Sequence, residues 1–426
     1  MSWTIWMAVA VVIATVWALV KRLETRLVLL VAGLVMTLLS GDPLAAFRQF
    51  DKSMTNPNLI IAICSAIGFA GVVTVTRCDV HLVALLTKPL KRIGFLLLPL
   101  CGVVVGVIAL ALPSTAGVCA AVGPTLVPLM VRTGFRPAAA AAMVVGSITP
   151  AFLNPGISHN VFIAKIAGME VMEFIGKFAP TTLIISAVSI AAVTAVCLAY
   201  GDYRPGREVE PQAAAGGDAP AKAALPEHPN FLYAIAPLVP VGILVAASLL
   251  APQLKLSVAT AMLLGMIYAV AVTRTAPDKA VKEFFNGMGS GYAKILGIII
   301  AAGVFAAGLR SAGVISVFVD FLTHAQEVAK IGGSVGPFAL ALLTGSGDAA
   351  AFAFNEAVTP HAAEFGLTID GLGYLAALAA GLGRPASPLC GGLIIVAGIA
   401  MTSPMEIAKR TAPAMVIALA ALYFII

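Results

Sequence analysis

Long apolar stretches dominate this chain, and short segments that carry most of its charge separate them. A membrane-spanning helix needs about 20 apolar residues, and fewer when half of it is buried in protein. Ten stretches meet this requirement, at residues 3–20, 27–40, 59–76, 137–164, 179–200, 231–251, 256–273, 291–310, 371–401 and 411–426. We therefore expect an all-α polytopic membrane protein with ten transmembrane helices.

Composition excludes several other classes of protein. Of the 426 residues, 60% are hydrophobic and 11% are charged. A soluble protein of this size cannot bury so much apolar surface, because much of its accessible surface must meet water. These values exclude a soluble enzyme and a disordered chain, and no concentrated basic face indicates nucleic acid as a partner. The weak alternation of outer-membrane barrel strands is also absent.

Two further apolar stretches, 93–131 and 331–363, have polar centres that break a helix. We interpret both as re-entrant hairpins that enter and leave the membrane on the same side. Charge supports this topology. With both termini outside, 18 of the 26 Lys and Arg residues fall on the cytoplasmic side, and seven fall on the other side. Basic residues favour the cytoplasmic side, so we expect periplasmic termini in a bacterial inner membrane.

A polar segment at 201–229, rich in Gly, Pro, Ala and charge, divides the chain almost in half and is expected to be a cytoplasmic linker. The halves, 1–200 and 230–426, each have scaffold helices (3–76 and 231–310), a hairpin, a broken helix and a last helix. Because each half has five crossings, the second half is inverted relative to the first. Inverted repeats with paired broken helices are typical of secondary transporters.

The polar residues of the apolar region are concentrated at four predicted helix breaks. The first lies at 113–117 and the second at 147–160, and the third and fourth follow in the same order at 344–348 and 381–388. Unwound backbone survives in a membrane only where it lines a cavity or meets a ligand. Half-helix N-termini attract anions, whereas freed carbonyls and Ser, Thr or Asn oxygens can hold a cation.

Arg384 lies inside a predicted broken helix, whereas the other 25 basic residues are assigned to the two membrane faces, and it is suited to bidentate pairing with a substrate carboxylate. The alternative is that it pairs with Asp348 or a backbone carbonyl and fixes the break. Asp348 is a candidate for cation or proton binding, or else an N-cap. His159 is a candidate proton-coupling group, or else a structural histidine. Glu356 is expected to face protein or water.

The candidate site residues form two sets. The expected substrate-binding residues are Ser114, Thr115, Thr149, Asn154, Gly345, Ser346, Gly347, Arg384 and Ser387. The candidates for a coupling ion or proton are Asp348, His159 and Asn160. No Walker A motif or zinc-type cysteine spacing is present, so we expect no cofactor other than a sodium ion or proton as coupling ion.

At these breaks the sequence resembles the anaerobic four-carbon dicarboxylate transporter C (DcuC) family of the ion transporter superfamily. The resemblance covers nearly the whole chain in order and spacing. It rests on Leu-Thr-Gly-Ser-Gly-Asp-Ala at 343–349, Gly-Leu-Gly-Arg-Pro-Ala-Ser-Pro at 381–388 and the segment 396–411. Looser matches are Ser-Thr-Ala-Gly at 114–117 and the stretch 155–164.

The resemblance implies exchange or ion-coupled transport of dianions such as fumarate, succinate and malate, by an elevator motion in a protein that is often a homodimer. It also implies site roles for Ser114, Thr115, Gly345, Ser346, Gly347, Arg384 and Ser387. The chain departs from the family pattern at Asp348, where asparagine is frequent, and at His159, where aspartate is frequent.

Three other functions are compatible with parts of the pattern. The Gly-Ser-Gly-Asp segment at 345–348 looks like an element of intramembrane aspartyl proteases, but no predicted span supplies the second aspartate that this chemistry needs. A channel is disfavoured by the paired breaks in inverted halves. A transporter of the same fold for a monocarboxylate or a sulfonate is the main alternative.

Overall fold

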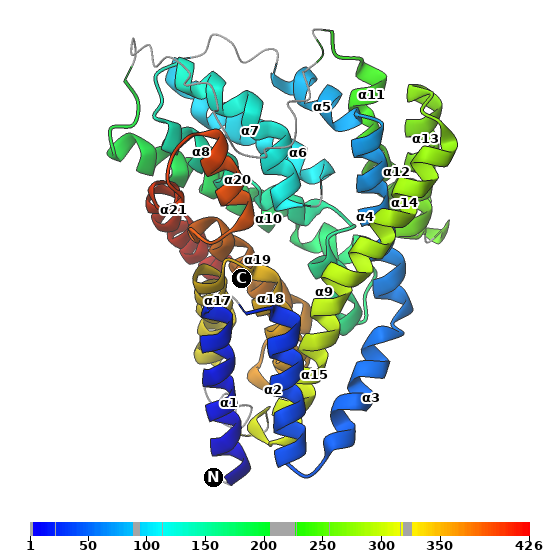
Figure 1. Cartoon of the computed structure of the whole chain (residues 1–426), viewed down its shortest axis with the longest axis vertical. Helices are drawn as coiled ribbons and strands as arrows, with labels where there is room; N and C mark the ends of the chain where they lie inside the picture. Colours follow the sequence, from blue (N-terminus) through cyan, green and yellow to red (C-terminus); the bar gives the residue numbers. More distant parts are fainter. Residues whose placement is uncertain are drawn as a thin grey trace.

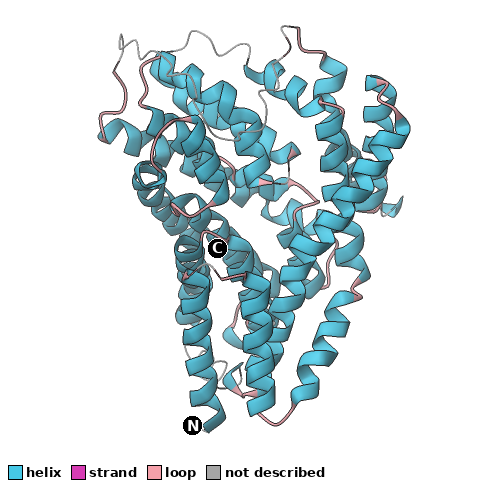
Figure 2. Ribbon diagram, in the orientation of Figure 1, coloured by secondary structure: helices cyan, strands magenta, loops and turns pink. Residues whose placement is uncertain are grey.

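The computed structural model describes residues 3–21, 23–87, 94–112, 114–204, 226, 228–254, 256–315, 317 and 326–426. These residues form helices joined by loops (Figure 2), with one isolated bridge between Phe135 and Tyr203. Pro113 of the first predicted break and nearly all of the predicted linker (205–225 and 227) lie outside the described residues.

The helices of the first half begin with α1 and end with α10. Their bounds are α1 (Trp3–Val20), α2 (Thr25–Leu39), α3 (Pro43–Met54), α4 (Pro57–Val75), α5 (Cys78–Thr87), α6 (Leu97–Ala111), α7 (Thr115–Arg132), α8 (Pro137–Gly146), α9 (Ser158–Ala167) and α10 (Val171–Ala199). The 3₁₀ turns η2 (Gly94–Leu96) and η3 (Thr149–Leu153) precede α6 and α9.

The helices of the second half begin with α11 and end with α21. Their bounds are α11 (Phe231–Ile235), α12 (Val239–Leu250), α13 (Val258–Thr273), α14 (Pro277–Gly291), α15 (Gly297–Ser311), α17 (Gln326–Thr344), α18 (Gly347–Ala357), α19 (Ile369–Ala386), α20 (Gly391–Ile399) and α21 (Pro404–Ile425). Between them lie the short turns η4 (Ala236–Leu238), η5 (Pro252–Leu254) and η7 (Thr359–Phe365), and the π-helical turn η6 (Tyr292–Leu296).

Six helical stretches within the described residues are long and apolar enough to cross a membrane, and seven if the bent pair α3–α4 is one span. Two of them, Pro137–Ala167 and Ile369–Ile399, coincide with the predicted broken helices. Other apolar helices, such as α1, α2 and α6, are shorter. The chain is therefore a helical membrane protein, and the exact number of ten crossings stays a prediction.

The longest helical stretch corrects one predicted boundary. The span expected at 291–310 is the second part of a continuous helix over Pro277–Ser311, in which a π-helical turn joins α14 to α15. Proline at the first helical position starts this helix early. Glycine then lets α14 pack closely on α4, because a Cβ at Gly287 would lie 2.6 Å from the carbonyl oxygen of Ile67.

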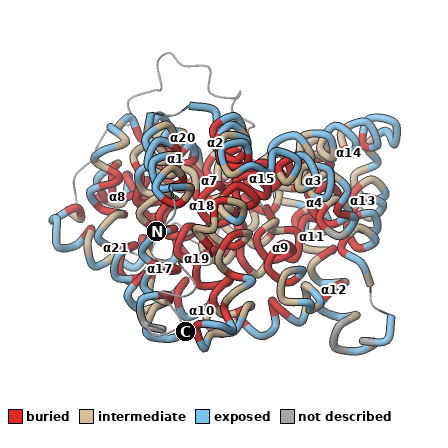
Figure 3. The backbone as a smooth tube through the Cα atoms, turned by 90° about the horizontal axis from the view of Figure 1, so that it is seen from below, coloured by how far each residue is buried: buried red, intermediate tan, exposed pale blue. Residues whose placement is uncertain are grey.

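The four breaks meet near the middle of the molecule. Figure 1 places α6, α7, α8 and α20 toward one end and α1, α2 and α3 toward the other, with α18, α19 and α9 between them. Helix α19 packs against α17, α18, α21 and α9, so it lies at the centre of the segments that carry the breaks. Its residues Leu372–Ala380 are all buried, as are Ala138–Val145 of the alanine-rich α8. Figure 3 shows these buried segments enclosed by helices with exposed outer faces.

Candidate functional site

Breaks three and four lie directly against each other. Gly345 has φ +74°, and a Cβ there would lie 2.7 Å from the backbone carbonyl of Leu389. A Cβ at Gly347 would lie 2.8 Å from the carbonyl oxygen of Ala380. Both positions therefore require glycine, for the left-handed backbone at the first and for close approach at both. This contact brings the N-terminus of α18 against the C-terminal turns of α19.

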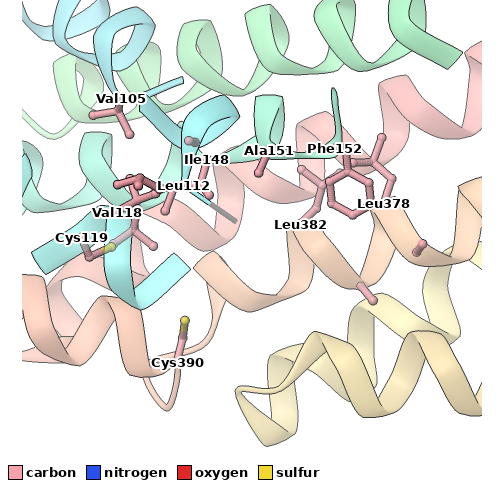
Figure 4. Close-up of a cluster of buried hydrophobic side chains, with 14 of the residues drawn as sticks. Val105, Leu112, Val118, Cys119, Ile148, Ala151, Phe152, Leu378, Leu382 and Cys390 are labelled. Atoms are coloured by element: carbon pink, nitrogen blue, oxygen red, sulfur yellow. The ribbon is translucent and has the colours of Figure 1, made fainter. Parts of the chain in front are cut away.

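Break one lies beside the start of α20. A Cβ at Gly392 would lie 2.8 Å from the Thr115 methyl carbon and 3.2 Å from Cys119 Sγ. Figure 4 shows the apolar cluster at this junction, with Cys119 of α7, Cys390 before α20 and Phe152 of η3. Thus the fold gathers segments near all four breaks, although breaks one and four lie more than 260 residues apart in sequence.

Two asparagines of break two hydrogen-bond to the backbone that the break frees. Asn154 donates from Nδ2 to the carbonyl of Leu110 at 2.7 Å, and its Oδ1 accepts from the Gly156 amide at 2.7 Å. Asn160 donates from Nδ2 to the carbonyl of Phe152 at 2.7 Å. These bonds give both buried side chains a structural role. Substrate binding by Asn154 and ion coupling by Asn160 stay predictions.

Three predicted site residues from three different helices converge on one carboxylate. His159 in the first turn of α9 places Nε2 3.1 Å from Oδ1 of Asp348, which lies in the first turn of α18. Arg384, in the last turn of α19, places Nη1 3.4 Å from the same oxygen. The side chain of His159 is 6% exposed, and those of Asp348 and Arg384 are each 24% exposed. We call these three residues the His–Asp–Arg cluster.

Two nitrogens of the His–Asp–Arg cluster have no hydrogen-bond partner among the described residues. They are Nδ1 of His159 and Nε of Arg384, and both are buried. Buried polar groups in proteins are nearly always hydrogen-bonded, so open positions of this kind are typical of a site that receives a ligand. A guanidinium with an open edge suits a carboxylate.

Two of the predicted hydroxyl residues accept hydrogen bonds from local backbone amides. Ser114 is the N-cap of α7 and accepts from the Gly117 amide at 3.2 Å, whereas Ser387 accepts from the Leu389 amide at 3.2 Å. Ser346 is the N-cap of α18. The N-cap alternative for Asp348 is therefore wrong, because Asp348 lies inside the helix and its carboxylate contacts His159 and Arg384. Thr149 is half-buried at the start of η3.

Sequence reasoning missed the aromatic walls around His159. Its ring stacks on Phe352 with centroids 4.5 Å apart and lies parallel to Phe152 with centroids 6.0 Å apart. Phe352 lies one helical turn after Asp348, on the same face of α18. This spacing was the one feature of the sequence that could have placed Phe352 near the candidate site. These rings restrict the imidazole to its position beside the carboxylate.

The structure corrects the assignment of Arg410 to a membrane face, because Arg410 is a buried basic residue inside a membrane-length helix. Helix α21 begins at Pro404, seven residues before the predicted start, and Arg410 is 3% exposed inside it. Nε and Nη2 of Arg410 donate to the two carboxylate oxygens of Asp202 at 2.6 and 2.8 Å. This pair lines a cavity of about 430 Å³. His159, Asp348 and Arg384 are not among the residues that line this cavity.

Among the described residues, no group of three or more His, Cys, Asp and Glu side chains is arranged to hold a metal ion. The His–Asp–Arg cluster contains one acidic group and two cationic or potentially cationic groups. Its chemistry therefore fits an anion and a proton better than a metal cation.

Comparison with known proteins places this arrangement in a family. The family model for DcuC, described as a C4-dicarboxylate anaerobic carrier, matches residues 41–426. A Haemophilus influenzae protein described only as a transporter is 44% identical over 62% of this chain and 96% of its own length. The Escherichia coli K12 anaerobic C4-dicarboxylate transporter DcuC is 29% identical over 83% of this chain and 76% of its own length.

Two solved structures share the fold at 14% identity. The YdaH transporter of Alcanivorax borkumensis superposes with a TM-score of 0.63, covering 89% of this chain and 86% of that chain. MtrF of Neisseria gonorrhoeae, described with a class of antimetabolite efflux pumps, superposes with a TM-score of 0.60, covering 89% and 82%. Both are transporters, and the family model spans most of the chain. The protein therefore belongs to the DcuC family of C4-dicarboxylate carriers.

Proposed function

We propose that this protein is a secondary active transporter that carries four-carbon dicarboxylates, such as fumarate, succinate and malate, across a bacterial inner membrane. The observation that supports this proposal best is the environment of the Arg384 side chain. This side chain carries a half-buried guanidinium at the junction of two helix breaks, and its Nε has no partner among the described residues. Arginine presents a planar fork that matches one carboxylate of a diacid.

The second carboxylate of the diacid has a candidate position at a helix N-terminus. Helices α7 and α18 both begin at breaks, with Ser114 and Ser346 as their N-caps. Free amides and the positive end of a helix dipole favour an anion there. In this proposal Arg384 fixes one end of the substrate, and Ser114, Thr115 and Ser346 border the other.

For the transport cycle we propose an elevator motion between two groups of helices. The proposed moving group contains the breaks and runs over α6–α10 and α17–α21, and the scaffold contains α1–α4 and α11–α15. Support comes from the matching order of elements, since α6–α7 and α8–α9 in the first half parallel α17–α18 and α19–α20 in the second. The groups meet where α15 and α4 pack on α18 and α9.

One polar contact crosses the proposed boundary between the two groups. Gln49 of α3 lies 3.4 Å from Glu356 of α18, through its Nε2 and the carboxylate Oε1. Cysteines at these two positions, bridged by a reducible bifunctional thiol reagent that spans the length of the two original side chains, should stop transport reversibly if α18 moves past α3. Full transport by the cross-linked protein would exclude this direction of motion.

The proposal includes periplasmic termini, a cytoplasmic linker at 201–229 and a homodimer formed through the scaffold. The bias of basic residues supports the orientation. Exchange of two diacids and symport with a sodium ion or a proton are both compatible with the cluster. Labelling of single cysteines placed at residues 3 and 215 by a membrane-impermeant reagent tests the orientation.

Counterflow of labelled succinate into proteoliposomes loaded with unlabelled succinate, fumarate or malate tests the substrate. We expect all three diacids to drive uptake, with protein-free liposomes as the control. The alternative, a carrier for a monocarboxylate or a sulfonate, predicts counterflow with those anions alone. Absence of exchange with every four-carbon diacid would reject the proposed substrate class.

A further inference from the structure

The His–Asp–Arg cluster places two nitrogen donors on a single oxygen. Asp348 Oδ1 lies 3.1 Å from His159 Nε2 and 3.4 Å from Arg384 Nη1. The contact with arginine is long and involves one nitrogen, whereas arginine pairs most strongly through two parallel bonds. Asp348 is itself a carboxylate, so it occupies part of the position that a substrate carboxylate would take at Arg384.

His159 is the group that can take Asp348 away from Arg384. Stacking on Phe352 holds the imidazole beside the carboxylate. A carboxylate only accepts hydrogen bonds, so the neutral ring must carry its proton on Nε2, and Nδ1 is then an acceptor. Protonation adds a donor at Nδ1, which has no partner among the described residues, and gives His159 a full charge toward Asp348.

No other charged group competes for His159 in the described part of the chain. The helices packed on α9 are α4, α10, α18 and α19, and the charged group from them that contacts His159 is Asp348, which also contacts Arg384. Lys177 pairs with Asp370, and Glu356 lies against Gln49. The remaining titratable side chains of α9 and these four helices are exposed, hydrogen-bonded elsewhere or buried thiols, namely Lys165, Glu170, Glu173, Tyr374, Cys64 and Cys197.

The net charge of the cluster decides whether it accepts an anion. With neutral His159, the charges of Asp348 and Arg384 cancel, and the site has no net attraction for a carboxylate. With protonated His159, the cluster carries one net positive charge. An incoming carboxylate can then pair with Arg384, because His159 stabilises Asp348 in its place.

We propose that Asp348 is a resident counter-ion that competes with the substrate for Arg384, and that protonation of His159 relieves this competition. One proton then enters the site on Nδ1 of His159 with each diacid and leaves when the diacid leaves. This inference rests on the proposed function and specifies its coupling ion as a proton. No covalent bond forms or breaks, and the proton comes from the solution on the side where substrate binds.

Uptake of labelled fumarate by proteoliposomes tests the competition, because it gives the apparent KM at each external pH. For the wild type we expect the apparent KM for fumarate to fall roughly tenfold between about pH 8 and about pH 6, because acid conditions favour the proton that relieves the competition. Asp348→Asn removes the competitor and should give a low KM at both pH values. His159→Asn removes the proton site and should give a high KM at both.

The double variant His159→Asn/Asp348→Asn decides whether Asp348 competes with the substrate or positions Arg384. If Asp348 competes with substrate, removing it rescues the loss of His159, and the double variant resembles Asp348→Asn. If Asp348 instead positions Arg384, the double variant binds fumarate as weakly as His159→Asn or more weakly, which would overturn the proposal. Thermal unfolding of each purified variant separates these outcomes from misfolding.

His361→Asn is the matched control, because His361 pairs with Glu364 outside the cluster and should keep the wild-type pH profile. The wild-type profile is decisive even if a cluster variant fails to fold. Uptake with the same KM from pH 6 to pH 8 contradicts the proton role alone. Absence of fumarate uptake by the wild type at every pH contradicts the proposed function, and the inference fails with it.

Discussion

Two Arg–Asp pairs in this protein differ in how completely the arginine is bonded. Arg410 donates to both carboxylate oxygens of Asp202 at 2.6 and 2.8 Å, and its Nη1 donates to the carbonyl of Glu406 at 2.6 Å. Arg384 reaches Asp348 through one nitrogen at 3.4 Å, and its Nε has no partner among the described residues. The first pair is nearly inaccessible, whereas the second is about one quarter exposed.

The difference indicates separate roles for the two arginines. A fully bonded buried pair gains little from a new anion, because any ligand must first break strong bonds. Asp202 also accepts the Arg136 amide at its carbonyl, so this pair joins the end of α10 to α21 and the loop before α8. A loose pair can exchange its carboxylate at low cost. In the proposed function Arg384 is therefore the arginine that binds substrate.

Replacing Arg384 should have the largest effect on transport. We expect Arg384→Ala to lower succinate counterflow by roughly 30-fold to several thousandfold, since truncating one partner of a buried charge pair costs about 2–5 kcal/mol and each 1.4 kcal/mol is a factor of about ten. The folded protein should persist, because Asp348 keeps its contact with His159. Counterflow and thermal unfolding measured on one preparation test both statements.

Arg384→Lys is the conservative control, and it should retain part of the activity because it keeps the charge but loses the planar fork. If Arg384→Ala yielded no monodisperse protein in detergent, Arg384 would instead be required for folding. That outcome would remove the distinction between the two pairs.

Replacing Arg410 should act on stability and leave substrate affinity unchanged. Arg410→Ala leaves the fully buried Asp202 with only the longer contact to Arg136 at 3.6 Å, and breaking a buried pair costs about 3–5 kcal/mol. We expect a lower unfolding temperature and a lower yield, but a wild-type KM for succinate in the protein that does fold. A raised KM without loss of stability would show that Arg410, like Arg384, belongs to a ligand site.

The sequence singled out Arg384 but not Arg410. Arg384 stands out because Gly, Pro and Ser surround it inside an apolar stretch, and its helix ends at Ala386, within the predicted break at 381–388. Arg410 lies just before an apolar stretch and counts as a loop residue when hydropathy alone sets the boundary. Its burial depends on Asp202, which is 208 residues away, and hydropathy along the chain carries no information about that contact.

The same limit applies within the candidate site. Polar composition identified His159, Asp348 and Arg384 as separate candidates, and a pair between Asp348 and Arg384 was one expected alternative. The convergence of both nitrogens on one oxygen depends on how α9, α18 and α19 cross, which local patterns do not encode. The bonds of Asn154 to Leu110 likewise depend on a helix from another segment.

Changing the contact behind Arg384 should have an intermediate effect. In Gly347→Ala the new Cβ would lie 2.8 Å from the Ala380 carbonyl oxygen and 3.0 Å from Cγ of Arg384. Overpacking of this kind costs about 1–3 kcal/mol, and it displaces the guanidinium of the loose pair. We expect roughly a tenfold higher KM for succinate in counterflow, from the same free-energy range.

Gly336→Ala is the matched control for Gly347→Ala. Gly336 lies in α17, and a Cβ there would meet no atom within 4 Å. Alanine should be neutral or slightly stabilising at this position, since it favours a helix more than glycine does. Equal effects of the two substitutions would mean that the contact with Arg384 does not matter for substrate binding.

The smallest effect is expected at the second carboxylate near Arg410. Glu406 lies 3.2 Å from Nη1 of Arg410, but its side chain is 43% exposed, whereas that of Asp202 is fully buried. Exposed ion pairs contribute little because water and salt screen them. Asp202→Asn should therefore lower the unfolding temperature clearly, and Glu406→Gln should leave it nearly unchanged at moderate salt. Equal decreases in unfolding temperature would mean that both carboxylates stabilise Arg410 through their negative charge, whatever their bonding geometry. In that case, bonding geometry would not be what separates the two arginines, and the assignment of Arg384 would depend on the transport measurements alone.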